Sequence, residues 1–281
     1  MGDGLLKLGI IGYGSVASLA LTAIAQSPER PLELACILAK PDGAHRAEAL
    51  LESLGAGLAI RRIVVTDIQE LLALGPDLVA EAAGHESIAA HGAKVLFAGC
   101  DLIVTSAGSL AVEQLRDAMD RAAHSGGARY LICPGAIGGL DIISAAKLSG
   151  LTKLVYSSRK PAQAWRGTAA EKLVDLSALQ EPCCFFEGNA GEAARSYPQN
   201  ANVAATLALL GPGFDKTIVQ LIADPGVTRN THTIILTSAC VDVEMTIAGL
   251  PSPDNPKTSM TTGFALAAQI IEIMHRNDGR N

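Results

Sequence analysis

The sequence is poor in aromatic and charged residues and lacks long apolar runs. Aromatic residues make up 4% of the 281 residues and charged residues 18%, whereas hydrophobic residues make up 49%. Such an apolar composition excludes intrinsic disorder, and the length is sufficient for one large domain or two ordinary ones. No run of about 18 apolar residues occurs, so we expect no membrane-spanning helix. The core must be aliphatic, as is usual in α/β layers.

A basic excess is also lacking. The formal net charge is -6 at pH 7, which argues against a nucleic-acid or anionic-membrane surface. No CxxC pair occurs among the six cysteines, so we expect neither a disulfide framework nor a metal site. We expect buried thiols in a reducing compartment, and the absence of a signal segment predicts the cytoplasm. The cysteines are Cys36, Cys100, Cys133, Cys183, Cys184 and Cys240.

Short apolar runs alternate with amphipathic segments through the first half of the chain. The apolar runs predict strands at 5–11, 32–38, 61–65, 78–84, 102–105 and 129–133. The amphipathic segments predict helices at 19–25, 44–54, 68–74, 87–98 and 112–125. This alternation predicts a parallel sheet with helices on both faces.

The pattern changes after Pro134. Helices are predicted at 138–148, 200–210 and 259–274, and strands at 151–158, 183–187, 217–223, 232–238 and 241–247. Because most of these strands follow one another closely, we expect a largely antiparallel or mixed sheet in a second domain.

A glycine-rich turn follows the first predicted strand. Residues 12–17 read GYGSVA, which fits GxGxxA at the start of a predicted helix. In this motif the first glycine allows a tight turn, the second lets a pyrophosphate approach the backbone, and the helix N-terminus offers N–H groups. The alternative is a glycine turn needed for packing. We predict cofactor contacts from Gly12, Tyr13, Gly14, Ser15 and Val16.

These observations predict an α/β fold with an N-terminal Rossmann domain, a doubly wound parallel sheet, followed by a mixed α/β domain. The expected boundaries are a dinucleotide-binding domain at 1–134, a catalytic and dimerisation domain at 135–256, and a C-terminal helix at 257–281 that packs back on the first domain.

The end of the second predicted strand bears on cofactor choice. NAD-selective sites usually carry an acidic residue there, but this chain has Lys40, and Asp42 comes slightly later. Lys40, with His45 and Arg46 behind it, could accept a 2′-phosphate. The alternative is an ordinary solvated lysine. We expect NADP to be accepted alongside NAD.

Small residues follow two further strands of the same sheet. Ala83 and Ala107 lie where the fourth and fifth strands end, which leaves room for the nicotinamide half of a cofactor. His85 could be catalytic there, although a simple polar contact is the more common role of such a histidine.

Segments along almost the whole chain together resemble L-aspartate dehydrogenase. They include GIIGYGSVA, DLVAEAAGHES, VTSAGSLA and ICPGAIGGLD, then YPQNANVAATLAL, DPGVTRNTHTI and NPKTSMTTGFALA. The resemblance implies reversible, NAD(P)-dependent deamination of L-aspartate to iminoaspartate or oxaloacetate and ammonia. It also implies a homodimer and a role in NAD biosynthesis.

The family's catalytic histidine matches His232, and a histidine suits proton transfer near neutral pH. Its role requires the imidazole to lie beside the nicotinamide. The family's further cofactor contacts match Ala136 and Asn202, with Asn200 as the alternative if the register is shifted. Asn202 could also cap the helix that follows it.

A dicarboxylate substrate needs cationic or hydroxyl partners. We predict Lys257, Thr258 and Ser259, which we also expect to begin the final helix. Further candidates are Arg159, Lys160 and Arg166.

Two other functions remain open. A homoserine-dehydrogenase-like or dihydrodipicolinate-reductase-like oxidoreductase has a similar build, so the fold cannot separate them. A non-catalytic NAD(P)-sensing module is the alternative of another class, but no segment for DNA or partner binding is evident.

Overall fold

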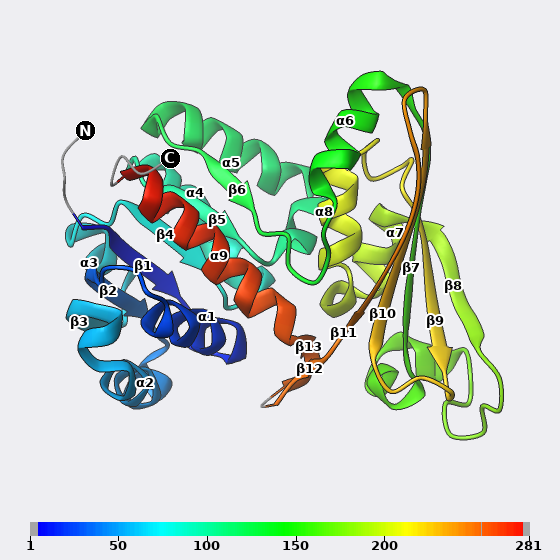
Figure 1. Ribbon diagram of the computed structural model, residues 1–281, viewed down its shortest axis with the longest axis horizontal. Coiled ribbons are helices and arrows are strands. Elements are labelled where there is room, and N and C mark those ends of the chain that lie inside the picture. Colours follow the sequence, from blue (N-terminus) through cyan, green and yellow to red (C-terminus); the bar gives the residue numbers. More distant parts are fainter. Residues whose placement is uncertain (1–4, 254, 278–281) are drawn as a thin grey trace. The chain divides into compact units, whose positions relative to one another are not determined.

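The alternating segments of the first half form a parallel sheet with strand order β3-β2-β1-β4-β5-β6 (Figure 1). The strand order reverses between β1 and β4. In sheets of this kind, ligands bind at such a reversal, beyond the carboxyl ends of the strands. The predicted doubly wound sheet is confirmed. Its strands are β1 (Lys7–Ile11), β2 (Leu32–Leu38), β3 (Ala59–Val65), β4 (Leu78–Glu81), β5 (Asp101–Val104) and β6 (Tyr130–Ile132).

The computed structural model describes residues 5–253 and 255–277, except for the side chains of residues 256, 257 and 277. The chain divides into two units. The first combines Met1–Cys133 with Thr262–Asn281, and the second is Pro134–Thr261. The C-terminal segment is thus part of the unit that holds the parallel sheet.

Helices cover both faces of this sheet. Leu8 and Ile10 of β1 share a core with residues of α1, α2 and α9, whereas Gly9 faces Leu71 of α3. Figure 1 shows α1 and α9 side by side, and Gly263 permits this contact because an added Cβ would lie 2.5 Å from Cβ of Leu19. The helices are α1 (Ser15–Gln26), α2 (Ala44–Leu58), α3 (Ile68–Ala73), α4 (His85–Phe97), α5 (Glu113–Gly126) and α9 (Met260–Asn277).

The second unit contains a mixed sheet with strand order β11-β10-β7-β9-β8. Strands β7 and β9 pair in parallel, and the other pairs are antiparallel, as predicted for this half. The strands are β7 (Leu151–Pro161), β8 (Cys183–Asn189), β9 (Ile218–Asp224), β10 (Asn230–Ser238) and β11 (Asp242–Gly249). A short hairpin of β12 (Pro251–Ser252) and β13 (Asn255–Ser259) follows.

One face of the mixed sheet packs against α6 (Leu140–Gly150), α7 (Ala190–Ser196) and α8 (Asn202–Leu210). Inward residues alternate with half-exposed ones along β7, which places Leu154, Tyr156, Ser158 and Lys160 on the helix-covered face. Ser158 and Lys160 are polar, so the covered face carries buried polar groups toward the carboxyl end of β7.

Two expectations were wrong, and one helix was missed. Residues 255–259 form strand β13, and the last helix begins at Met260. Helix α7 was missed, although Asn189 and Glu192 form a capping box that the sequence spells out as N-x-x-E. Three thiols are not buried, because Cys183 is half-buried and Cys184 and Cys240 are exposed.

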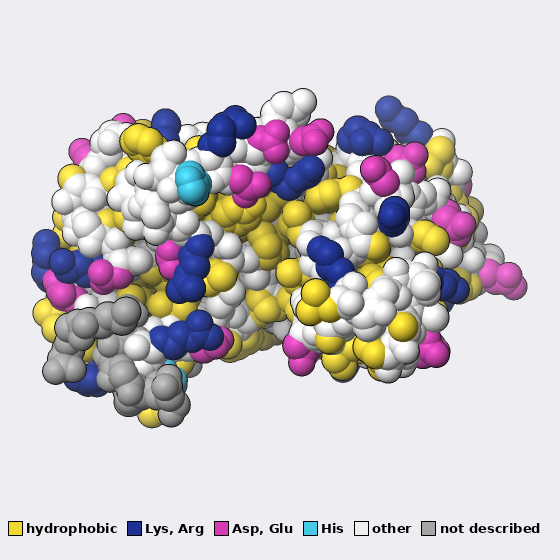
Figure 2. All heavy atoms as spheres, turned by 90° about the horizontal axis from the view of Figure 1, so that it is seen from above, with side chains coloured by type: hydrophobic (Ala, Val, Ile, Leu, Met, Phe, Trp, Pro, Cys, Tyr) yellow, Lys and Arg dark blue, Asp and Glu magenta, His cyan; other side chains and the backbone are white. Residues whose placement is uncertain are grey.

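Within the described part of the chain, none of the helices is both long and apolar enough to cross a membrane. Acidic and basic side chains are interspersed over the face shown in Figure 2.

Candidate functional site

The turn between β1 and α1 has the geometry that phosphate binding needs. Gly12 has φ of 103°, a value that favours glycine, and its N–H donates to the carbonyl oxygen of Leu38 at 3.0 Å. A Cβ added at Gly12 would lie 2.8 Å from Cβ of Ala83. A Cβ added at Gly14 would meet no described atom within 4 Å. Gly12 is therefore required by packing, while Gly14 leaves open space for a ligand.

The open space lies at the N-terminus of a well-anchored helix. Gly14 is exposed and precedes α1, Ser15 and Val16 are half-buried in its first turn, and Ala17 is fully buried. A helix N-terminus presents backbone N–H groups and a partial positive charge to an anion. The residues present therefore fit the pyrophosphate of a dinucleotide.

Tyr13 is held against the loop that follows β2. Nη2 of Arg46 donates to the phenol oxygen at 3.1 Å, and the guanidinium carbon lies 5.2 Å from the ring centroid. Gly43 packs so closely that a Cβ there would overlap the phenol oxygen. Lys40 is exposed and precedes the 3-10 helix η1 (Pro41–Gly43). Lys40 in this loop and Arg46 in the first turn of α2 therefore place two cations near the end of β2.

Glu81, the last residue of β4, is fully buried and connects two loops. Its Oε1 accepts from the N–H groups of Ala83 and Gly84 at 2.8 and 2.7 Å and from the hydroxyl of Ser106 at 2.9 Å. Its Oε2 accepts from the N–H of Ser106 at 3.0 Å and from the hydroxyl of Thr105 at 3.5 Å. One carboxylate thus fixes the loops after β4 and β5 together.

Sequence reasoning passed over Glu81, although a carboxylate ending an otherwise apolar strand was a usable signal. The alanines predicted beside it lie in the two loops: Ala83 is exposed next to Gly12, and Ala107 is fully buried at the start of η2 (Ala107–Ala111). His85 is the first residue of α4 and is half-buried. The structure thus brings Gly12 and Ala83 together at one edge of the sheet.

His232 lies on β10 in the second unit and is 4% exposed. Its Nδ1 is 2.7 Å from the phenol oxygen of Tyr156, and the two rings stack with centroids 5.9 Å apart and planes inclined by 14°. Burial, together with the positive charge of Lys160, lowers the pKa of His232 to about 4. Burial raises the pKa of the Tyr156 phenol far above its usual range. At neutral pH both side chains are therefore uncharged.

Lys160 lies near the end of β7 and is 7% exposed. Its Nζ donates to Oδ1 of Asn200 at 2.6 Å and lies 4.9 Å from the ring centroid of Trp165. Burial lowers the pKa of Lys160 to about 8. The ammonium form therefore persists at neutral pH, although its environment disfavours the charge.

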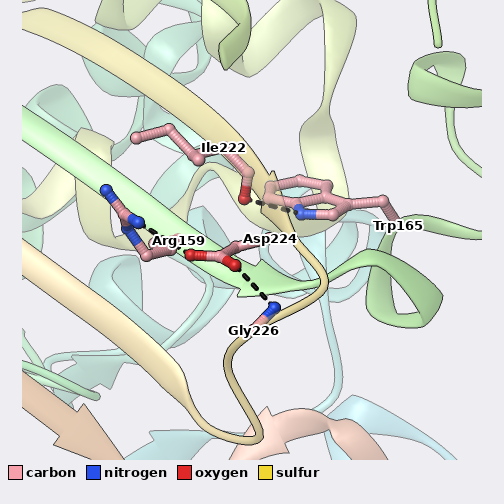
Figure 3. A network of polar contacts seen from close by, with 5 residues as sticks. All are labelled: Arg159, Trp165, Ile222, Asp224 and Gly226. Atoms are coloured by element: carbon pink, nitrogen blue, oxygen red, sulfur yellow. Dashed lines mark hydrogen bonds and ion pairs between the residues drawn. The ribbon is translucent and has the colours of Figure 1, made fainter. Parts of the chain in front are cut away.

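Arg159 belongs to a polar network around the carboxyl ends of β7 and β9 (Figure 3). Its Nη1 lies 2.7 Å from Oδ2 of the buried Asp224, whose Oδ1 accepts from the N–H of Gly226 at 2.7 Å. Nε1 of Trp165 donates to the carbonyl oxygen of Ile222 at 3.1 Å. Because Arg159 already has a carboxylate partner, it is a poorer candidate for a substrate carboxylate than Lys160.

The predicted cofactor contacts of this unit lie in a turn and near the start of α8. Ala136 is 7% exposed in the turn after Cys133, and Asn202 is the first residue of α8, so Ala201 occupies the cap position. Asn200 ends the 3-10 helix η5 (Pro198–Asn200), where it meets Lys160.

The predicted substrate residues lie on β13. Thr258 is half-buried, and Ser259 is 6% exposed, with its hydroxyl accepting from the N–H of Thr261 at 3.3 Å. Ser259 thus begins the final helix as a cap rather than lying within it. The side chain of Lys257 lies outside the described residues.

Two family models match the chain in the order of its two sheets. The model described as homoserine dehydrogenase, NAD binding domain, matches residues 12–132. The model described as aspartate dehydrogenase, C-terminal, matches residues 141–273. The first model covers the glycine-rich turn and the second covers His232.

Relatives match over nearly the full length. The L-aspartate dehydrogenase of Polaromonas sp. (strain JS666) is 36% identical over 95% of this chain and 97% of its own. That of Pseudomonas aeruginosa is 38% identical over 96% and 98%. The crystal structure of aspartate dehydrogenase from Thermotoga maritima covers 95% of this chain and 96% of its own, with a TM-score of 0.73 and 22% identity. This structure shares the fold.

Proposed function

Because this chain belongs to the L-aspartate dehydrogenase family, we propose that it catalyses the NAD(P)-dependent oxidative deamination of L-aspartate. The substrate loses a hydride from Cα and a proton from its amino group to give iminoaspartate, and water then converts this imine to oxaloacetate with release of ammonia. The observation that carries the proposal is the buried, neutral His232 held by Tyr156 in a chain of this family.

The cofactor residues of the proposal are those of the glycine-rich turn and of the two loops fixed by Glu81. Gly12, Gly14 and the first turn of α1 hold the pyrophosphate, and Ala83 and Ala107 leave room beside it. A nicotinamide cofactor bound by these residues would supply the acceptor for the hydride that leaves Cα. Ala136 and Asn202 make the further contacts, the latter through an amide that can donate and accept at a carboxamide.

His232 is the proton acceptor. In the tautomer with the proton on Nδ1, this N–H donates to the Tyr156 oxygen, so Nε2 keeps its lone pair. Nε2 then takes the proton from the substrate amine, and Tyr156 holds the resulting imidazolium. A dianionic ligand nearby would offset the positive charge of Lys160 and raise the pKa of His232 from about 4 toward neutrality.

Both NAD and NADP serve as cofactors in this proposal. Lys40 and Arg46 supply positive charge where an NAD-selective enzyme carries a carboxylate. Lys40→Ala should raise the KM for NADP about tenfold and leave that for NAD within about twofold. Equal effects on the two cofactors would remove Lys40 from the site.

We also infer a cytoplasmic homodimer. Every cysteine is a free thiol, which suits a reducing compartment. The face of the second sheet opposite its helices carries the half-exposed Val155, Ile222 and Ile235, which a second copy could cover. Light scattering should give twice the chain mass of 29.0 kDa, and a value of 29.0 kDa would exclude the dimer. Iminoaspartate formed this way would supply NAD biosynthesis.

The reaction is tested by NAD(P)H absorbance with L-aspartate, and by oxaloacetate with ammonia in reverse. His232→Ala should lower kcat by at least about 100-fold with the affinity for cofactor unchanged. His124→Ala, at an exposed position near the end of α5, is the matched control and should behave like the parent. Homoserine as the better substrate, or full activity of His232→Ala, would contradict the proposal.

A further inference from the structure

Lys160 is a buried cation with no anionic partner among the residues that the structure describes. Its ammonium contacts an amide oxygen and the face of an indole ring, and no carboxylate of the described residues lies within 4.0 Å of it. Its neighbour Arg159 is more exposed and yet has an ion-pair partner in Asp224. Burying a charge without its counterion is costly, so such a group is a candidate for binding a ligand.

Two further polar groups lie on the same face of the sheet. Ser158 is 1% exposed, and its register partner on β10 is His232. The hydroxyl of Ser158 makes no hydrogen bond of good geometry to the described residues, although it lies close enough to Tyr156 to oppose the rise of the phenol pKa. Buried hydroxyls without partners are rare in folded proteins. This one can donate to a ligand that enters between Lys160 and His232.

The strand geometry places these groups within reach of one small molecule. Lys160 is two residues beyond Ser158 on β7, so it is a diagonal neighbour of His232 across the β7–β10 pair. Such neighbours lie about 7–8 Å apart, and their Cβ atoms are somewhat closer. The positive charge of Lys160 acts on the imidazole, which agrees with this proximity. Nε2 of His232 has no hydrogen-bond partner within the described part of the chain.

We propose that Lys160 and Ser158 bind one carboxylate of a small dicarboxylate ligand beside His232. The ammonium supplies the ion pair and the hydroxyl a hydrogen bond, while Asn200 orients Nζ from the other side. This deepens the proposed function, since aspartate and oxaloacetate are four-carbon dicarboxylates. The ligand anion then provides the counterion that the described residues do not supply.

The test is thermal unfolding of the full chain with increasing succinate, an unreactive four-carbon dicarboxylate, and with butyrate for comparison. We expect succinate to raise the Tm of the parent and butyrate to raise it much less. In Lys160→Met the shift should be lost, and in Lys160→Arg part of it should remain. Lys153→Met removes an exposed lysine of the same strand and should respond like the parent.

The ligand-free proteins separate binding from a structural role. Removal of an uncompensated buried charge should leave the Tm of Lys160→Met equal to or above that of the parent. A lower Tm with an intact succinate shift would mean that Lys160 is structural, and this result overturns the proposal. Should Lys160→Met fail to fold, Lys160→Gln gives the same comparison.

Steady-state kinetics distinguish this inference from the proposed function. Lys160→Met should raise the KM for aspartate by about 30-fold or more, with the Kd for cofactor unchanged. Aspartate turnover together with parent-like succinate binding by Lys160→Met would refute the carboxylate site and leave the reaction standing. Succinate binding through Lys160 without aspartate turnover would support the carboxylate site and refute the proposed reaction.

Discussion

Nδ1 of His232 lies 2.7 Å from the phenol oxygen of Tyr156, and the two side chains come from neighbouring antiparallel strands. The phenol is fully buried and stays protonated at all physiological pH values, because burial raises its pKa. Tyr156 can therefore fix the orientation of the imidazole without competing for its proton. This makes Tyr156 a positioning residue in the proposed reaction.

Tyr156→Phe should lower kcat about tenfold and leave the KM for aspartate within about twofold, because the ring remains and one orienting hydrogen bond is lost. It should also cost about 1 kcal/mol of unfolding free energy. Tyr130→Phe is the control, since Tyr130 donates to Asp120 at 2.7 Å in the other unit. An unchanged kcat in Tyr156→Phe would exclude the positioning role.

The stability of the protein should fall as the pH is lowered from about 6.5 to about 4. His232 has a folded-state pKa of about 4, below the unfolded value of 6.5. Between these values the unfolded chain binds the proton more readily, so acid favours unfolding by up to roughly 3 kcal/mol. Urea unfolding of the parent and of His232→Gln across this range measures the difference. Parallel pH profiles for the two proteins would be inconsistent with a buried neutral imidazole.

The stability of the protein should also rise with pH through the deprotonation of Lys160, but in a more alkaline range than for His232. Its folded-state pKa of about 8 is below the unfolded value of 10.5, so the folded state loses its proton first as the pH rises. Above pH 8 the cost of burying the ammonium disappears, and the stability of the parent should increase relative to Lys160→Met. Urea unfolding at pH 7.5 and pH 10 detects this gain. A constant difference between the two proteins would mean that Lys160 is solvated.

Two glycines of the same turn should respond differently to alanine. Gly12→Ala combines a left-handed φ with a contact of 2.8 Å to Ala83, so it should cost about 2 kcal/mol of unfolding free energy. Gly14→Ala has an ordinary φ of -75° and open space, so stability should be retained. Its methyl group should nevertheless weaken cofactor binding at least about tenfold by fluorescence titration. Unimpaired binding in Gly14→Ala would argue against the phosphate site.

Glu81→Gln should destabilise the first unit by about 2–4 kcal/mol, because the new amide nitrogen must face an N–H donor that the carboxylate satisfied. It should also weaken cofactor binding, since both loops lose their common anchor. Glu52→Gln is the control at an exposed position of α2. If Glu81→Gln matches this control in urea unfolding and in cofactor Kd, Glu81 does not hold the loops.

The sequence predicted the elements of the first half well, because the local apolar pattern there agrees with the positions that the fold buries. Residues 32–38 were expected as a strand and form β2 with the same bounds. GxGxxA after an apolar strand identified a turn that the structure builds with a positive φ at Gly12. The strand at 255–259 was missed, because an Asn-Pro-Lys-Thr-Ser segment is typical of a helix start, although its pairing partner β12 is a close neighbour along the chain.

By itself, the sequence determined the α/β class and the glycine turn, since periodicity and spacing are local properties of the chain, and its resemblance to a known family singled out His232. The tertiary structure decided which polar side chains are buried and what they meet. Tyr156 is 76 positions from His232, and Asn200 is 40 positions from Lys160. Such partnerships depend on strand register and on burial, and burial determines whether a charge is solvated or left without its counterion.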